Sequence, residues 1–177
     1  MVSRERDTLL NVARIIVVVV QALMVVGALA LIITVPIILL SQGEMLQEIR
    51  AEFGPEASLP LPIILTILAA SFVTVALAWH FLRNLRRIID TVGEGDPFVP
   101  VNADRLTAMA WLMLAIQGLG LVLGSLVFAA SQTLRDPLIM ADISIDLGGI
   151  VLVITLFILA RVFRVGAAMR DDLEGTV

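Results

Sequence analysis

This chain of 177 residues is 59% hydrophobic, with a mean hydropathy of +1.03 and a formal net charge of −4. Soluble domains contain only about half apolar residues, so the composition excludes a water-soluble globular protein and predicts an integral membrane protein. The chain has no cysteine, which excludes disulfides, thiolate nucleophiles and thiolate metal sites.

Four apolar stretches follow one another at 15–40, 61–82, 108–130 and 145–163. The first three exceed the roughly 20 residues that a helix needs to cross a bilayer. The fourth is apolar only over 147–163 and reaches spanning length if it begins near Ile143, with Asp146 among the headgroups. We therefore expect one all-α membrane domain over 1–177, an antiparallel four-helix transmembrane bundle.

The basic residues indicate which loops face the cytoplasm. All twelve are arginine, and ten of them lie before the first stretch, in the central loop 83–107 or at 161–170. Outer loops 41–60 and 131–144 hold one each, Arg50 and Arg135. By the positive-inside rule, both termini and the central loop are expected in the cytoplasm of a multi-pass plasma-membrane protein. The net acidity gives no reason to expect direct nucleic-acid binding.

Loop 41–60 carries Glu44, Glu48 and Glu52 at intervals of four, with apolar residues between them. This period predicts an amphipathic helix lying at the outer membrane interface. The carboxylates either form a solvated face, which we favour, or bind a divalent cation. Gly54 and Pro55 should end the helix, and loop 131–144 should be a short connector.

Within 15–40, 61–82, 108–130 and 147–163 there is no acidic residue, and Arg161 lies close enough to the inner edge to extend to the headgroups. Transport of ions usually needs an ionisable residue within the membrane. The uncharged polar residues Gln21, Gln117 and Ser125 would line a solute path or, as we favour, form hydrogen bonds between helices.

Small residues at intervals of four predict close helix packing. Gly120 and Gly124 form a GxxxG pair in the third stretch. The partner helix belongs to the same chain, which we favour, or to a second copy in a homodimer.

An enzymatic role is not expected. The chain has one histidine and no tyrosine or cysteine, so the usual acid, base and nucleophile are missing. His80 follows Trp79 at the end of the second stretch, where an aromatic residue at the membrane interface is typical. No cofactor and no metal site are predicted.

Central loop 83–107 predicts a helix, a tight turn and a second helix. An amphipathic period continues the second stretch until Gly93 and Gly95, and Asp96 with Pro97 predicts a turn. Asn102 is a good N-cap for the helix that runs into the third stretch. Phe98 lies at the tip of the hairpin and is exposed unless another segment covers it.

The run GEGDPFVPVNADRLTAMAW, which begins at Gly93, resembles the signature of a four-span bacterial and archaeal membrane family called domain of unknown function 2975. In that family a Gly-(Asn/Asp)-Pro-Phe turn precedes an Asn-Ala-x-Arg-Leu helix start. The final ILARVFRVGAAMRDDLEGTV is similar to the family's closing pattern.

The resemblance implies a membrane partner of a small helix-turn-helix transcription regulator, because family members are commonly encoded beside one. Binding at the membrane would keep the regulator from DNA. The residues assigned to this contact lie in the central loop and the tail 164–177: Gly95, Asp96, Pro97, Phe98, Asn102, Arg105, Arg164, Asp171, Asp172 and Glu174. The competing interpretation is internal, with 98–101 packed against 175–177 as a cap on the bundle.

The sequence is also compatible with a second class of function. Four spans with uncharged polar groups also fit a small transporter, channel or peptide-resistance protein that acts on a neutral or lipophilic solute. In that case Gln21, Gln117 and Ser125 should be accessible to water, whereas the regulatory role depends on the loop and the tail.

Overall fold

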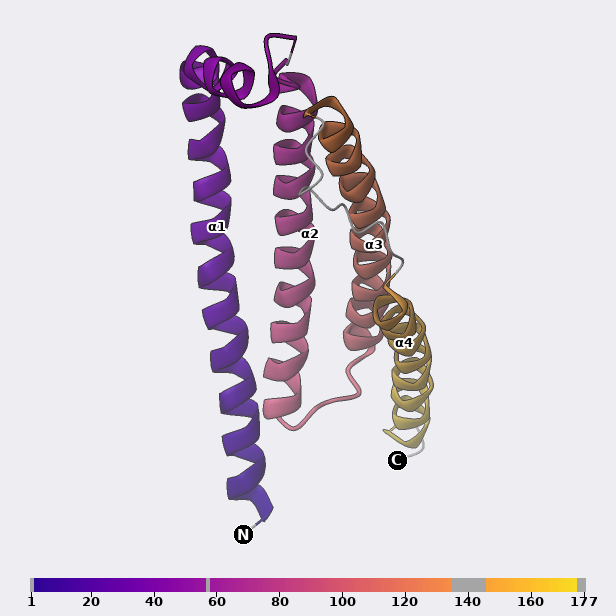
Figure 1. Cartoon of the computed structure of the whole chain (residues 1–177). Helices are drawn as coiled ribbons and strands as arrows, with labels where there is room; N and C mark the ends of the chain where they lie inside the picture. Colours follow the sequence, from indigo (N-terminus) through magenta and orange to yellow (C-terminus); the bar gives the residue numbers. More distant parts are fainter. Residues whose placement is uncertain (1, 57, 135–145, 175–177) are drawn as a thin grey trace. The chain divides into compact units, whose positions relative to one another are not determined.

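The computed structural model describes residues 2–56, 58–134 and 146–174 (Figure 1). Within these ranges the chain is helical and has no strand. Its four helices are α1 (Val2–Phe53), α2 (Leu61–Gly93), α3 (Pro100–Leu134) and α4 (Leu147–Glu174). All four are long and apolar enough to cross a membrane. This confirms the all-α class and the helices of a multi-pass membrane protein.

The chain divides into two compact units, each built from separate segments. One unit holds 1–24, 77–117 and 146–177, and the other holds 25–76 and 118–145. We call them the hairpin unit and the loop unit. Helices α1, α2 and α3 each contribute to both units, whereas the described part of α4 belongs to the hairpin unit alone.

The core of the hairpin unit lies where α2, α3 and α4 meet. Ile88 of α2, Met109 of α3 and Leu156 of α4 are buried in one cluster. Phenylalanines surround it, and the ring of Phe157 lies 5.5 Å from Trp111 in an edge-to-face arrangement. Helices that lie in lipid associate through close van der Waals packing, and the packing of this cluster positions the α2–α3 turn beside α4.

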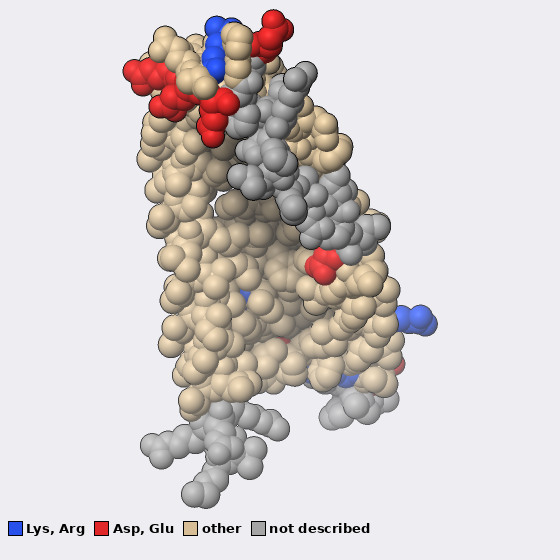
Figure 2. Space-filling model, viewed as in Figure 1, with Lys and Arg blue, Asp and Glu red and all other residues tan. Residues whose placement is uncertain are grey.

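In the loop unit, α1 continues through Pro36 to Phe53, so the predicted amphipathic segment is the end of α1 and not a separate helix. Glu44, Glu48 and Glu52 are exposed, whereas the large apolar residues between them, Met45, Leu46 and Ile49, are partly buried. Figure 1 shows α1 turning across near this end, and Figure 2 shows acidic side chains gathered there. As predicted, Gly54 ends the helix, with φ at +98°.

Helix α4 begins at Leu147 because Asp146 caps it. The two carboxylate oxygens accept hydrogen bonds from the backbone N–H groups of Gly148 and Gly149, each at 3.0 Å. The expected start near Ile143 lies outside the described residues. The helix reaches spanning length by continuing to Glu174, well beyond the end of the predicted stretch.

We expect Asp146→Ala to lower the free energy of unfolding by about 1 kcal/mol, because two N–H groups of the first turn lose their acceptor. Thermal unfolding in detergent micelles, followed by circular dichroism, measures the change. Asp146→Asn retains a capping oxygen and should stay within about 0.5 kcal/mol of the wild type. Equal losses in both variants would contradict the capping role.

Candidate functional site at the hairpin

The site lies at the turn between α2 and α3, which we call the hairpin and define as residues 91–106. Gly95 stops α2 because its φ is +88°, a value that glycine adopts without strain. Its N–H donates to the carbonyl of Val92, and the N–H of Asp96 donates to that of Thr91, both at 3.1 Å. These two bonds form a Schellman motif, which fixes the direction in which the chain leaves the helix.

Asn102 is not the N-cap that the sequence predicts. Helix α3 begins two residues earlier, at Pro100, where proline suits the first helical position. Asn102 instead lies in the first turn with its side chain fully buried. Its Nδ2 donates to the Thr91 hydroxyl at 2.8 Å and to the Pro97 carbonyl at 3.0 Å. The amide thus joins α2, the turn and α3.

Arg105 completes this network from the next turn of α3. Its guanidinium donates to Asn102 Oδ1 at 2.8 Å and to the Arg87 carbonyl at 3.1 Å. That carbonyl belongs to α2, so the guanidinium joins the beginning of α3 to the preceding helix. The Thr91 hydroxyl donates to the Ile88 carbonyl at 2.9 Å. The hairpin is therefore closed by side chains from both helices.

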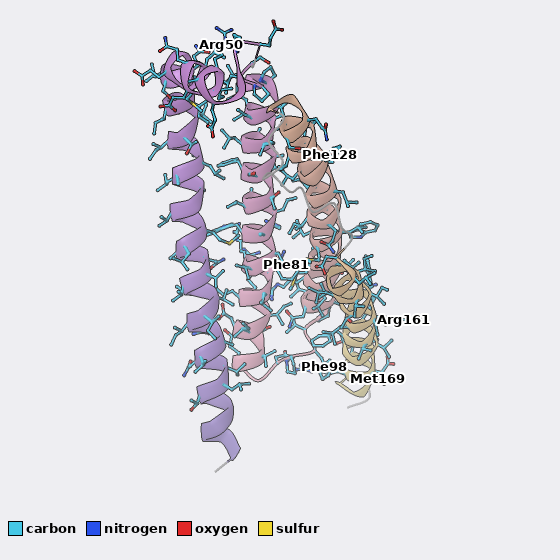
Figure 3. All side chains as sticks on the ribbon, viewed as in Figure 1. Arg50, Phe81, Phe98, Phe128, Arg161 and Met169 are labelled. Atoms are coloured by element: carbon cyan, nitrogen blue, oxygen red, sulfur yellow. The ribbon has the colours of Figure 1, made fainter. Side chains whose placement is uncertain are left out.

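Phe98, at the tip of the hairpin, packs on α4. Its ring centroid lies 5.3 Å from that of Phe163. A Cβ added at Gly166 would lie 2.7 Å from the Phe98 ring, so only glycine leaves room for the ring there. Figure 3 shows Phe98 beside the half of α4 that carries Met169. Phe98 remains 40% exposed, and the predicted contact with 175–177 lies outside the described residues.

Ion pairs connect the hairpin with α4, and the end of α2 just before it with α1. Asp90 of α2 pairs with Arg14 of α1 at 2.5 Å. Asp96 in the turn pairs with Arg170 of α4, and Asp104 of α3 pairs with Arg164 at 3.3 Å. These side chains are more than one-third exposed, so each pair contributes at most about 1 kcal/mol. Arg164 and Asp96, both assigned to a partner, thus also have partners within the chain.

Other charged and apolar groups near the hairpin remain on the surface. Glu94 in the turn and Asp171 and Asp172 of α4 are exposed. Val101 is 42% exposed and Met169 is 58% exposed. This end of the hairpin unit therefore presents acidic side chains beside apolar ones, on a support held by hydrogen bonds and ring packing.

The polar residues predicted within the apolar stretches make different contacts. Gln117 of α3 donates to the Asp146 carbonyl at 2.9 Å, and Ser125 donates to the Val122 carbonyl within its own helix at 2.8 Å. Gln21 is buried and lines an open groove between α1 and α2. At Gly120 a Cβ would meet no described atom within 4 Å. That half of the GxxxG pair therefore has no close intrachain neighbour among the described residues.

Sequence reasoning missed several residues that build this site. Thr91 was not singled out, although a hydroxyl near a helix end is a recognised capping group. Gly166 gave no turn signal because it lies inside a helix. The Arg14–Asp90 pair joins residues far apart in the chain, and a single sequence does not show such a pairing.

Among the residues with described positions, no three acidic or histidine side chains come together to hold a metal ion. The chain matches no curated protein and no solved structure. A family model described as "Protein of unknown function (DUF2975)" matches residues 44–177. This range includes the hairpin, α4 and the amphipathic end of α1, so the resemblance seen in the sequence is confirmed. The chain belongs to the DUF2975 family.

Proposed function

We propose that this chain is a non-enzymatic membrane protein that binds a small helix-turn-helix transcription regulator through the hairpin and the end of α4. The observation that carries the proposal is the hairpin itself. Most of its signature residues fix its shape, and exposed acids remain beside it. A fixed surface is favourable for binding because less conformational entropy is lost when a partner docks.

The chemistry of the surface supports a basic partner. Glu94, Asp171 and Asp172 are exposed at this end of the hairpin unit. A DNA-binding surface carries Lys and Arg that contact phosphates, and acids on another protein attract the same groups. A regulator held in this way cannot use those side chains on DNA.

The location that we propose is the cytoplasmic side of the plasma membrane. It rests on the distribution of arginine, with ten of twelve residues near the termini or the hairpin. A soluble regulator can reach the hairpin only from that side.

A solute path through the helices receives less support. Of the three polar side chains that would line it, Gln117 and Ser125 donate their hydrogen bonds to backbone carbonyls. Such bonds are typical of polar residues that satisfy themselves within the membrane. Transport of a neutral solute is therefore the second candidate and not our proposal.

The test is recovery of the regulator with the membrane protein. We expect Asp171→Asn with Asp172→Asn to reduce the amount of helix-turn-helix protein that co-purifies from native cells by about tenfold. The reason is that each exposed charge contributes up to about 1 kcal/mol. Quantitative mass spectrometry of the detergent-solubilised complex measures it. Phe98→Asp would be a poor test, because it also removes the packing on Phe163 and Gly166.

The matched control is Glu44→Gln with Glu48→Gln, which removes the same charge from the exposed face at the end of α1. It should leave recovery unchanged. Recovery of no helix-turn-helix protein with the wild type, or equal losses in both double variants, would contradict the proposal.

A further inference from the structure

Within the hairpin unit, an open groove of about 560 Å³ lies between α1 and α2, away from the turn and α4. The side chains that line it are Val18, Gln21, Ala22, Trp79, Arg83 and Arg86. The groove thus combines two guanidinium groups and one amide with apolar walls.

The polar side chains of the groove have no hydrogen-bond or ion-pair partner among the described residues. Arg83 and Arg86 are exposed, and Gln21 is only 6% exposed although it lines the groove. None of these three side chains forms a hydrogen bond or an ion pair with another described residue. The Gln21 amide reaches the open groove and has no partner among the described residues, so a ligand that accepts hydrogen bonds finds a donor there.

The nearest acid on α2 does not neutralise these arginines. Asp90 lies one turn beyond Arg86, and its carboxylate pairs with Arg14 of α1 at 2.5 Å. This pair joins α1 to α2 beside the groove, and no described acid pairs with Arg83 or Arg86. The groove is therefore a place where negative charge is attracted.

The position of the groove along the helices matches a membrane boundary. The apolar stretch of α1 begins at Ile15, just before Val18, and that of α2 ends at Leu82, just before Arg83. Tryptophan is enriched at this depth, as are arginines that reach lipid headgroups. Trp79 and Ala22 then lie on the acyl-chain side of the arginines.

We propose that this groove binds the phosphate of an anionic phospholipid. Arg83 and Arg86 hold the phosphate oxygens by charge and hydrogen bonding, and Gln21 donates from the wall formed by α1. The apolar lining, which includes Val18 and Trp79, receives the first part of an acyl chain. This apolar wall favours a lipid over a soluble phosphate ion, which would leave it uncovered.

Quenching of Trp79 tests the proposal. The chain has two tryptophans, so Trp111→Phe leaves Trp79 as the only reporter. The protein is placed in phosphatidylcholine vesicles, and quenching by brominated phosphatidylglycerol is compared with quenching by brominated phosphatidylcholine. We expect the anionic lipid to be preferred, and Arg83→Gln with Arg86→Gln to lower the preference by about fivefold for each arginine.

Two further variants distinguish specific binding in the groove from non-specific attraction of anionic lipid to any arginine on α2. Gln21→Leu keeps both charges and should lower the preference about threefold through loss of one hydrogen bond. Arg87→Gln is the matched control, because Arg87 is an exposed arginine of the same helix that does not line the groove. It should leave the preference unchanged, and circular dichroism should show the helix content of the wild type in every variant.

The proposal is overturned if phosphatidylglycerol is not preferred, or if Arg87→Gln lowers the preference as much as each groove arginine does. The source of the phosphate is tested by adding inorganic phosphate at constant ionic strength. If the preference persists, the lipid is the ligand. Its disappearance would show that the groove binds a soluble anion, which would overturn the assignment to lipid.

Discussion

Replacing Asn102 with leucine is expected to lower the free energy of unfolding by about 2–4 kcal/mol, the largest effect of any single change in the hairpin. The amide is fully buried and makes three hydrogen bonds, to Thr91, Pro97 and Arg105. Leucine has a similar volume but leaves the Pro97 carbonyl without this donor and the Arg105 guanidinium with one acceptor fewer. A buried group that loses its partner costs about 1–3 kcal/mol. Denaturant unfolding in micelles measures the change.

Asn84→Leu is the matched control for this prediction. Asn84 is also buried, in α2, but its Nδ2 has no hydrogen-bond partner among the described residues. Removing an unsatisfied amide relieves a desolvation cost, so we expect this variant to be as stable as the wild type or more stable. If the two leucine variants lose the same stability, the hydrogen bonds of Asn102 are not the reason for its effect.

The second large effect is expected from Gly166→Ala in α4. Alanine normally stabilises a helix by up to about 1 kcal/mol relative to glycine. Here the new methyl group would lie 2.7 Å and 2.9 Å from two atoms of the Phe98 ring, which must leave its position beside Phe163. We expect a net loss of about 1–3 kcal/mol, measured by thermal unfolding in micelles.

Gly118→Ala tests the same substitution where there is space. A Cβ at Gly118 of α3 meets nothing within 4 Å among the described residues, so this variant should gain stability. Phe98→Leu supplies the second test, because a smaller side chain leaves room for the methyl group. The double variant Gly166→Ala with Phe98→Leu should lose less than the sum of the single changes. Additive losses would show that Phe98 and Gly166 do not interact.

Much of the fold could be predicted because helix length and apolar composition are local properties. The start of α2 at Leu61 and its end at Gly93 follow directly from proline and glycine signals. The start of α3 was misplaced because Asn102 has the chemistry of an N-cap, and only the tertiary contacts with Thr91 and Pro97 explain its burial. An asparagine near the start of a helix has the chemistry both of an N-cap and of a buried residue that joins neighbouring segments by hydrogen bonds.

The tight turn of the hairpin could be predicted from its glycine and proline residues, but the contacts of the residues around it could not be derived from the sequence. The motif around Phe98 left two interpretations open, a surface for a partner and a cap packed against 175–177, and the structure places its ring on α4. That contact depends on Gly166, which is far from Phe98 in the sequence because the whole of α3 lies between them. Local patterns predict turns and amphipathic faces, and they do not predict which distant helix covers an aromatic ring.

The composition of the hairpin unit has a consequence for biosynthesis. Its segments come from the first 24 residues, the middle of the chain and the residues from Asp146 onward. During translation α1 and α2 enter the membrane long before α4 is made, so Phe98 has no Phe163 to contact and Asp96 has no Arg170. The unit can close only after α4 has been synthesised. Truncation within α4 should therefore leave an inserted but incompletely assembled protein, which quality-control proteases recognise.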